Sequence, residues 1–179
     1  MIYLCRHGET EWSKSGRHTG STDLGLTETG KQQALALKNR LHNMQFTQVF
    51  SSPLRRARET AELAGFHPQI VPEAREWDYG HYEGKTSYEI GAEWNLFRDG
   101  APGGESPSQV AARADKLITR LGSGPVLLFS HGHFLRMLAA RWLHLPPENG
   151  SLFVLSTGSL SILGLDKQQK VIVQWNVSG

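Results

Sequence analysis

The sequence predicts an α/β protein, a three-layer αβα sandwich with a mostly parallel central sheet. Short apolar runs alternate along the chain with segments whose apolar residues recur at helical spacing, the pattern of repeated strand–helix units. One run, Val126-Leu127-Leu128-Phe129, is apolar throughout, as expected for a strand that is covered on both faces. The chain has 179 residues and shows no repeat or linker, so we expect a single domain over residues 1–179.

The N-terminal part of the chain predicts a strand, a loop and a helix. Residues Ile2–Cys5 form a short apolar strand, whereas residues 11–25 are rich in Gly, Ser, Thr and Lys and are expected to form a loop. Thr27 has a side chain suited to a helix N-cap, and Glu28 follows in the first turn. The buried stripe expected for this helix is Ala34, Leu37 and Leu41.

A strand, a helix and a third strand follow. Val49 and Phe50 close the second strand, and we expect Ser52 to cap the next helix with Pro53 at its first position. Residues 69–71 form the third short strand. The stripe that the helix between them buries is expected to be Leu54, Ala57, Ala61 and Ala64.

The second half of the chain begins irregularly and then regains its periodicity. Residues 75–84 are aromatic and irregular, residues 86–98 predict one or two short helices, and residues 99–104 a loop. Ser106 and Gln109 have the spacing of a capping box that opens a long helix. The apolar strand at residues 126–129 leads to a helix over residues 134–144. Strands are then expected at 151–156, 160–165 and 171–175.

Composition excludes several classes of protein. Hydrophobic residues make up 39% and charged residues 20% of the chain, which indicates a globular protein and not a disordered one. The formal net charge is +2 without a run of like charges, so we expect no nucleic-acid partner. The one cysteine, Cys5, excludes an internal disulfide and favours a reducing compartment. No signal-peptide pattern and no apolar run of roughly 20 residues is present, so we expect a cytoplasmic protein that does not enter membranes.

Two apolar strands end in similar polar motifs, Leu4-Cys5-Arg6-His7-Gly8 and Phe129-Ser130-His131-Gly132. In open parallel sheets the ligand crevice lies outside the carboxyl ends of the strands, so both histidines are expected to reach the same crevice. The second strand leads into residues 51–58, a helix N-terminus that carries arginines, and such a terminus suits an anion. This combination of histidines and arginines predicts chemistry on a phosphate.

The residue types predict how that chemistry would proceed. A neutral imidazole nitrogen is a competent nucleophile toward phosphorus and would form a phosphohistidine. Guanidinium groups of Arg6 and Arg56 could bind the phosphate oxygens bidentately. The leaving alkoxide needs a proton, for which Glu76 is the first candidate and Glu83 the alternative. We expect the aromatic residues around Glu76 to favour its protonated form by desolvation.

The turn Arg6-His7-Gly8-Glu9-Thr10 resembles the signature of the histidine phosphatase superfamily, in its phosphoglycerate-mutase-like branch. A lone Arg-His-Gly would be a weak signal, but further motifs follow in the family's order along nearly the whole chain. These motifs lie at residues 16–20, 24–30, 51–60, 75–80 and 130–132. The resemblance implies the phosphoglycerate-mutase-like form of the predicted sandwich.

The resemblance also implies a role for each matching residue. His7 would be the phosphorylated nucleophile and Glu76 the proton donor. Arg6, Arg56 and His131 would form the phosphate pocket, with no metal and no cofactor. The other residues implied to bind phosphate or substrate are Ser13, Thr19, Gly20, Gly132 and His133. Ser13 departs from the pattern of many mutases, which carry asparagine there, and its role stays open, as do the roles of His133, Arg136 and Glu83.

Residues 75–84, 94–100 and 131–136 more narrowly resemble the sedoheptulose-1,7-bisphosphatase type of sugar-phosphate phosphatase. The implied partner is a small phosphorylated metabolite, a sugar phosphate or bisphosphate. A cofactor-dependent phosphoglycerate mutase is the alternative. Mutases of this family carry a long basic insert after the proton donor. The corresponding segment here, residues 84–105, is short, and its basic residues are Lys85 and Arg98. Because a mutase must exclude water from its intermediate, the short segment favours hydrolysis.

Other interpretations remain open beside this one. A non-catalytic module that binds a regulatory partner or a phosphoprotein is possible in principle, although the intact set of site residues opposes it. A metal site at His7, Glu76, His131 and His133 is disfavoured because arginines beside a cation are electrostatically unfavourable. The residues expected on the surface are Arg55, Arg58, His18, His42, His67 and His144. Nothing in the sequence fixes the oligomeric state.

Overall fold

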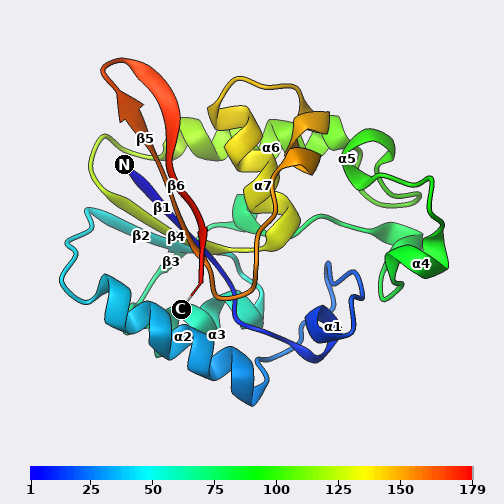
Figure 1. Cartoon of the computed structure of the whole chain (residues 1–179), viewed down its shortest axis with the longest axis horizontal. Helices are drawn as coiled ribbons and strands as arrows, with labels where there is room; N and C mark the ends of the chain where they lie inside the picture. The colour runs from blue at the N-terminus through cyan, green and yellow to red at the C-terminus, as the bar shows by residue number, and fades with distance from the viewer. Residues whose placement is uncertain (179) are drawn as a thin grey trace.

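The computed structural model describes residues 1–178, which are built around one six-stranded sheet with the strand order β3-β2-β4-β1-β5-β6 (Figure 1). The strands are β1 (Ile2–Arg6), β2 (Gln48–Ser51), β3 (Gln69–Ile70), β4 (Val126–Ser130), β5 (Leu160–Asp166) and β6 (Gln169–Val177). β1, β4, β2 and β3 run parallel, and β5 and β6 add an antiparallel edge beside β1. The mostly parallel sheet of the prediction is thereby confirmed.

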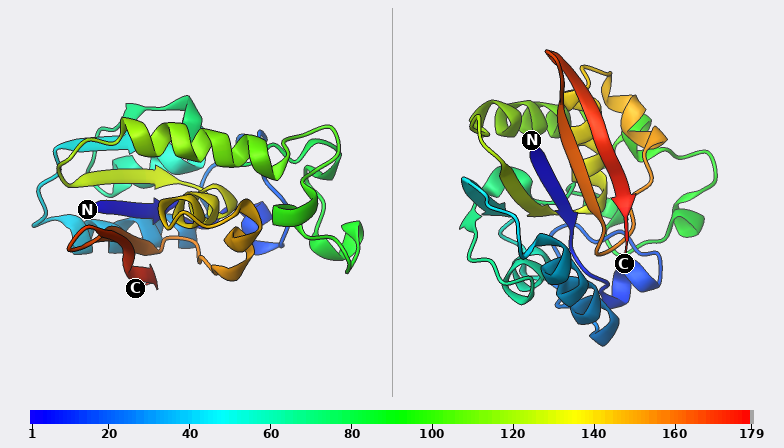
Figure 2. Two further views of the ribbon diagram at one scale, coloured as in Figure 1. Left: turned by 90° about the horizontal axis from the view of Figure 1, so that it is seen from above. Right: turned by 60° about the vertical axis from the view of Figure 1, so that its left-hand side comes forward.

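Helices cover both faces of the sheet, as Figures 1 and 2 show. α2 (Glu28–Leu41) and α3 (Arg55–Leu63) lie on one face, and α6 (Pro107–Arg120) and α7 (Gly132–Trp142) on the other. β4 supplies both cores by simple alternation, because successive side chains of a strand point to opposite faces. Val126 and Leu128 pack toward α6 and α7, whereas Leu127 and Phe129 pack toward α2 and α3.

Shorter elements lie outside the two helical layers. They are α1 (Glu11–Lys14), α4 (Ser87–Ile90), α5 (Leu96–Asp99) and three 3₁₀ helices at Pro72–Ala74, Gly80–Tyr82 and Pro147–Leu152. α4 and α5 correspond to the one or two short helices predicted for residues 86–98. Among residues 1–178, no helix has the length and the apolar character that a bilayer crossing requires.

The long helices begin where their capping residues predict. The Thr27 hydroxyl accepts a hydrogen bond from the N–H of Gly30 at 3.1 Å and so caps α2. Ser106 and Gln109 form the predicted capping box at α6, with Pro107 in its first turn. Each cap satisfies N–H groups that a helix terminus would otherwise leave unpaired.

The N-terminus of α3 and the loop after His7 differ from the prediction. α3 begins at Arg55, because the Ser52 hydroxyl bonds to the His131 ring and to the N–H of Leu54 instead of capping the helix. The predicted loop at residues 11–25 contains the single-turn helix α1, which Thr10 caps. Both differences arise from hydroxyl groups that bond to nearby partners, which the apolar periodicity does not show.

Residues 151–156 do not form the predicted strand. They complete a 3₁₀ helix at Leu152 and then run in an irregular path toward β5. Side chains take the place of a neighbouring strand here, since Trp175 Nε1 donates to the Val154 carbonyl at 2.7 Å and the Asn176 side chain accepts from the Ser156 N–H. The apolar alternation was therefore a misleading signal for a ladder of backbone hydrogen bonds.

Candidate active site

The site lies where β1 and β4 end side by side. Arg6 stands opposite Ser130 in the parallel register, and the His7 N–H donates to the Ser130 carbonyl at 3.0 Å. The next residue after each strand is a histidine, and the ring centres of His7 and His131 are 5.2 Å apart. The predicted meeting of the two histidines at one sheet edge is what the register produces.

His7 is held in the form that a nucleophile requires. Its Nδ1 lies 2.7 Å from the Gly8 carbonyl oxygen, which can only accept, so Nδ1 carries the proton and Nε2 keeps its lone pair. The ring is 4% exposed. Burial, together with the charges of Arg56 and Arg6, holds the pKa of His7 well below its usual value. The imidazole is therefore neutral at neutral pH, with one nitrogen available for attack.

Gly8 is required by a close approach of two backbone segments. A Cβ atom at Gly8 would lie 2.3 Å from the carbonyl oxygen of Gly30, far inside van der Waals contact. The Gly8 N–H donates to the Thr60 hydroxyl of α3 at 3.0 Å. The turn after β1 is thereby clamped between α2 and α3, which fixes the ring of the preceding His7.

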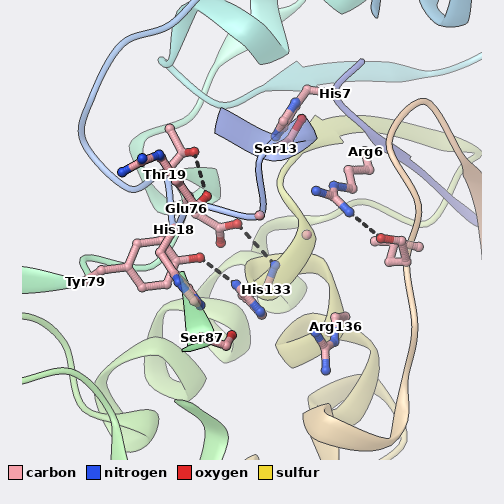
Figure 3. Close-up of a pocket in the computed structure, with 14 residues that line it drawn as sticks. Arg6, His7, Ser13, His18, Thr19, Glu76, Tyr79, Ser87, His133 and Arg136 are labelled. Carbon is pink, nitrogen blue, oxygen red and sulfur yellow. Dashed lines mark hydrogen bonds between the residues drawn. The ribbon is translucent and has the colours of Figure 1, made fainter. Parts of the chain in front are cut away.

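Arg6 points into the cavity next to His7 (Figure 3). One of its terminal nitrogens donates to the Leu155 carbonyl. Its Nε is buried and has no hydrogen-bond partner among residues 1–178. A Cβ at residue 132 would lie 3.2 Å from the guanidinium carbon, so Gly132 leaves the room that Arg6 needs beside the start of α7. Within the described chain, this N–H is therefore a buried donor without an acceptor, next to a cavity that Arg6 lines.

Arg56 and His131 lie behind the cavity and do not line it. Both are fully buried, and Arg56 Nε donates to His131 Nδ1 at 3.2 Å. The other guanidinium nitrogens of Arg56 donate to the backbone carbonyls of Thr19, Gly20 and Thr22. Arg56 thus holds the loop that carries Thr19 against the end of β4.

The tautomer of His131 follows from these bonds. Because Nδ1 accepts from Arg56, Nε2 carries the proton and donates to the Ser52 hydroxyl at 2.7 Å. Burial and the charge of Arg56 hold the pKa of His131 well below its usual value. His131 is a neutral hydrogen-bond donor held beside the ring of His7.

Glu76 lies in the cavity wall, as predicted for the proton donor, but its surroundings are not those expected. Its carboxylate accepts hydrogen bonds from the backbone N–H groups of Trp77, His133 and Phe134 at 2.9, 3.1 and 2.9 Å. Two of these donors belong to the N-terminus of α7, a natural position for a carboxylate. The apolar enclosure of the carboxylate that we expected is therefore wrong.

Glu83, the alternative donor, lies elsewhere. Its carboxylate accepts from the N–H groups of Gly20 and Thr22, and the residue does not line the cavity. Gly20 is buried and likewise absent from the cavity wall. Of the two candidate carboxylates, Glu76 lines the same cavity as His7, whereas Glu83 binds the backbone of the loop at residues 20–22.

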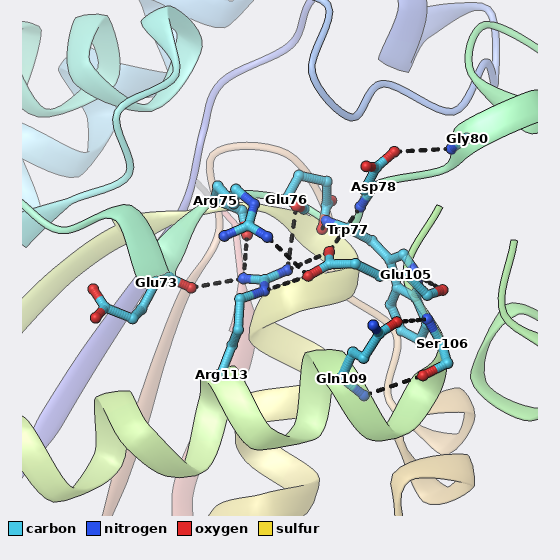
Figure 4. Close-up of polar contacts among 10 residues, drawn as sticks. All are labelled: Glu73, Arg75, Glu76, Trp77, Asp78, Gly80, Glu105, Ser106, Gln109 and Arg113. Atoms are coloured by element: carbon cyan, nitrogen blue, oxygen red, sulfur yellow. Dashed lines mark hydrogen bonds and ion pairs between the residues drawn. The ribbon is translucent and has the colours of Figure 1, made fainter. Parts of the chain in front are cut away.

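A buried ion pair supports the segment that carries Glu76 (Figure 4). Both carboxylate oxygens of Glu105 bond to the Arg113 guanidinium at 2.8 Å. Arg113 also binds the carbonyls of Glu73 and Arg75, while the Trp77 indole donates to the Glu105 carbonyl. Although desolvation opposes it, hydrogen bonding to Arg113 lowers the pKa of Glu105. The chain on both sides of Glu76 is thereby fixed to α6.

The cavity has a volume of about 230 Å³. Its wall includes the predicted residues Arg6, His7, Ser13, Thr19, Glu76, Gly132 and His133. The Ser13 hydroxyl accepts from the Thr10 N–H and donates to the Thr10 carbonyl, so it closes the turn of α1. Arg136, whose role the sequence left open, also lines the cavity.

Six further wall residues were not among the predicted site residues: Gly16, Arg17, His18, Tyr79, Ser87 and Leu155. His18 was expected on the surface, which is wrong, because it is 8% exposed and its Nδ1 donates to the Lys85 carbonyl at 2.7 Å. Its position within the motif at residues 16–20 was the signal that could have placed it. The exposed positions expected for the other surface residues are confirmed: Arg55, Arg58, His42, His67 and His144.

The side chains do not gather as a metal site would require. Within residues 1–178, no three His, Cys, Asp or Glu side chains are grouped so that they could hold a metal ion. His131 bonds to Arg56 and Ser52, and His133 bonds to Tyr79, so both rings of the sequence motif use nitrogens on protein partners. Cys5 is a buried small hydrophobe, and burial raises the pKa of its thiol.

Residues 2–178 match the family model described as the histidine phosphatase superfamily, branch 1. The chain belongs to this family. As a histidine phosphatase it is a phosphoric monoester hydrolase, and phosphatases are found among its relatives. The phosphoglycerate-mutase-like fold and the family implied by the sequence motifs are confirmed.

This histidine phosphatase is similar in sequence to proteins from bacteria and from yeast. An acid phosphatase of Mycobacterium tuberculosis is 39% identical over 99% of this chain and 93% of its own length. The sedoheptulose 1,7-bisphosphatase of Saccharomyces cerevisiae is 36% identical over 79% of this chain and 67% of its own length. A probable phosphoglycerate mutase of Erwinia tasmaniensis is 34% identical over 100% of this chain and 89% of its own.

The fold of this histidine phosphatase is also known from solved structures. That of an open reading frame from Mycobacterium tuberculosis matches with a TM-score of 0.94 and 38% identity, over 99% of this chain and 97% of that one. The likeness therefore extends through the sheet, the helices and the segments that carry the site.

Proposed function

We propose that this histidine phosphatase hydrolyses small phosphate monoesters, sugar phosphates or bisphosphates in the cytoplasm, through a phosphohistidine on His7. The observation that carries the proposal is the free lone pair of His7 Nε2 in a cavity that Arg6 and Glu76 also line. In this proposal the reaction uses neither a metal nor a cofactor, because histidine supplies the nucleophile and arginine neutralises the phosphate charge. The partner is a small phosphorylated metabolite.

The first half of the reaction transfers the phosphoryl group to the enzyme. His7 Nε2 forms a bond to phosphorus as the bond from phosphorus to the ester oxygen breaks. The leaving oxygen takes a proton from the Glu76 carboxyl group and departs as the alcohol. His7 Nδ1 keeps its proton throughout and donates it in a hydrogen bond to the Gly8 carbonyl, so the imidazole does not rotate during the transfer.

The second half releases phosphate. Water attacks phosphorus as the bond from phosphorus to Nε2 breaks, and the Glu76 carboxylate takes the proton that the water loses. His7 returns to the neutral ring and Glu76 regains the proton that it gave in the first half, so each turnover consumes one water and gives an alcohol and phosphate. The backbone N–H groups that hold Glu76 keep one carboxyl group in place for both proton transfers.

The phosphate contacts belong to the same proposal. The guanidinium group of Arg6, which lines the cavity beside His7, is suited to the equatorial oxygens, where charge grows in the transition state. Arg56 would act from behind His7 through its positive charge, and the neutral ring of His131, held between Arg56 and Ser52, would act beside it. The remaining predicted contacts are retained as part of the proposal: Ser13, Thr19, Gly20, Gly132 and His133.

Trapping the intermediate tests this proposal. Quenching the reaction of the protein with phosphate-labelled p-nitrophenyl phosphate in alkaline detergent should give a label that is stable in base and lost in acid, as a phosphoramidate is. The His7→Ala variant should lose both label and turnover, while His42→Ala, which removes an exposed histidine, should keep both. Activity that persists in His7→Ala would contradict the nucleophile, and activity that requires added metal after chelation would contradict the metal-free reaction.

A phosphoglycerate mutase is the second candidate, because relatives with that name cover the whole chain. A mutase must return the phosphoryl group to a second hydroxyl before water reaches it. Ser87 and Arg17 both line the cavity and are exposed, so water has access to the cavity. Incubation with 3-phosphoglycerate, with and without the bisphosphorylated cofactor, separates the two: isomerisation faster than phosphate release would favour the mutase.

A further inference from the structure

The cavity beside His7 continues into a second compartment. An adjoining cavity of about 200 Å³ shares four wall residues with the first: His18, Ser87, His133 and Arg136. Neither His7 nor Glu76 lines it. Figure 3 shows His7 at one end of the labelled residues and Ser87 and Arg136 at the other. A substrate whose phosphate lies at His7 would therefore extend its remaining part into this distal compartment.

Arg136 is the charged group of the distal compartment. Its Nε and Nη2 donate to the carbonyls of Gly150 and Ser151 at 3.2 and 3.3 Å. Its guanidinium carbon lies 4.7 Å from the ring centre of Phe97. Within the described chain, residues 1–178, Nη1 forms no hydrogen bond. The guanidinium is thus fixed in position with one edge left for a ligand.

His133 supplies a second donor of defined direction. The Tyr79 hydroxyl lies 2.5 Å from His133 Nδ1. Burial raises the pKa of Tyr79 well above its usual value, and burial lowers that of His133. The phenol keeps its proton and donates it to Nδ1, so His133 carries its own proton on Nε2. The ring also lies parallel to that of His18, with 7° between the planes and 5.8 Å between the centres, which restricts its rotation.

The charges around the two cavities favour an anion. Their walls contain the guanidinium groups of Arg6, Arg17 and Arg136 but one carboxylate, Glu76, within the described part of the chain. In the described part of the chain, Glu76 forms no hydrogen bond with Arg136, and its oxygens accept backbone N–H groups. The wall of the distal compartment contains the cation of Arg136 and two imidazole rings but no carboxylate within the described chain, and such a wall favours an anionic group.

We propose that His133 and Arg136 form a subsite for a second anionic group, a phosphate or a carboxylate, at the end of the substrate remote from His7. This inference rests on the proposed function, because it takes the transferred phosphate to lie at His7. Tyr79 is a positioning residue in this subsite, since it fixes which nitrogen of His133 donates. A distal hydroxyl would leave the charge of Arg136 without a counterion, so the subsite selects substrates with two anionic groups.

The test compares substrates that differ in the distal group alone. α,ω-Alkanediol bisphosphates of about three to seven carbon atoms are compared with the matching phosphate esters that end in a carboxylate or a hydroxyl, and with p-nitrophenyl phosphate. The expected kcat/KM for one or both anionic series exceeds that for the hydroxyl series by about 10- to 100-fold, through KM. Whichever anionic series prevails identifies the distal group. Equal kcat/KM across the three series would overturn the inference.

Variants assign the preference to the two residues. Arg136→Met should reduce the ratio of kcat/KM between the preferred anionic substrate and p-nitrophenyl phosphate by about tenfold or more, and Arg136→Lys should restore part of it. Arg98→Met removes a positive charge from neighbouring α5 outside both cavities and should keep the wild-type ratio. A ratio that is unchanged in Arg136→Met would contradict the subsite.

Two measurements are independent of turnover. Calorimetric binding of an alkane bisphosphonate should be tighter than that of the matching monophosphonate, and Arg136→Met should abolish the difference. ¹⁵N spectra of imidazole should show His133 protonated at Nε2, and the Tyr79→Phe variant should show a mixture of tautomers. Binding that discriminates without any hydrolysis would retain the subsite and reject the proposed function. Hydrolysis of p-nitrophenyl phosphate without discrimination would do the reverse.

Discussion

Arg56 donates its Nε–H to Nδ1 of His131 at 3.2 Å, and neither side chain is exposed to solvent. This one bond links α3 to the start of α7 and decides which nitrogen of His131 carries a proton. It also keeps a positive charge beside His7, where that charge favours the neutral imidazole. The pair of Arg56 and His131 therefore both connects two helices and favours the neutral form of His7.

Replacement of Arg56 should therefore affect stability and activity together. Arg56→Met strands the carbonyls of Thr19, Gly20 and Thr22 in a buried region, so we expect a loss of about 3 kcal/mol in the free energy of unfolding. Urea denaturation measures the loss. Arg55→Met, at the neighbouring position, removes the ion pair with Glu59, in which the arginine side chain is 58% exposed. This variant should lose less than about 1 kcal/mol in the free energy of unfolding. Similar losses in the two variants would argue against the bracing role of Arg56.

Stability should fall as the solution is acidified through the pKa of ordinary histidine, near 6.5. The buried rings of His7 and His131 have pKa values well below that of the unfolded chain, so below this pH the unfolded state binds protons that the folded state does not. The stabilisation present above that pH is then lost at up to about 1.4 kcal/mol per pH unit for each ring. Urea midpoints at a series of pH values measure the slope. His131→Asn should reduce it, and an unreduced slope would assign the effect to other groups.

Removal of the Glu105 carboxylate should act on catalysis through Glu76. Glu105→Gln leaves the largely buried Arg113 without its counterion, so we expect a loss of about 2 kcal/mol in stability and a lower kcat. Steady-state kinetics and urea denaturation test this. Glu28→Gln, which breaks an exposed pair with Lys31 on α2, should change neither quantity measurably. Full kcat in a correctly folded Glu105→Gln protein would show that Glu76 does not depend on this support.

A methyl group at Gly8 should displace the turn that carries His7. Gly8→Ala places a Cβ 2.3 Å from the Gly30 carbonyl oxygen, and two backbone segments must separate to accommodate it. We expect a loss of about 3 kcal/mol or turnover reduced below detection. Gly25→Ala is the control, because the atoms nearest to its Cβ belong to the Arg55 side chain, which is exposed and can move. Thermal unfolding and p-nitrophenyl phosphate turnover distinguish the two variants.

The fold was predictable because its signals are local. The period of the apolar residues, the caps Thr27 and Ser106, and the continuous apolar run of β4 each act within a few residues. The meeting of His7 and His131 was also predictable, since it follows from the rule that parallel strands end at one edge. These parts depend on backbone geometry more than on partners distant in the sequence.

What the sequence did not reveal are side chains that bond across the fold. His18 bonds to Lys85 and Glu105 bonds to Asp78, and no periodicity connects such pairs. Residues 151–156 have the alternation of a strand, yet Trp175 and Asn176 bind their backbone instead. The surroundings of Glu76 differ from the expectation for the same reason, because its aromatic neighbours in the sequence do not indicate that the N-terminus of α7 lies beside it.

The irregular path of residues 150–155 has a consequence for how this protein can change. Its carbonyls bind Arg6 at residue 155 and Arg136 at residues 150 and 151, whereas its side chains at Leu152 and Val154 are 70% and 72% exposed. The exposed side chains of this segment can therefore be substituted without affecting Arg6 or Arg136, whereas a change in the number of residues would move the carbonyls that bind them. An insertion or deletion in this segment would change the positions of both guanidinium groups together. The length of the segment is therefore a means by which evolution changes the size of the cavity without replacing a residue that lines it.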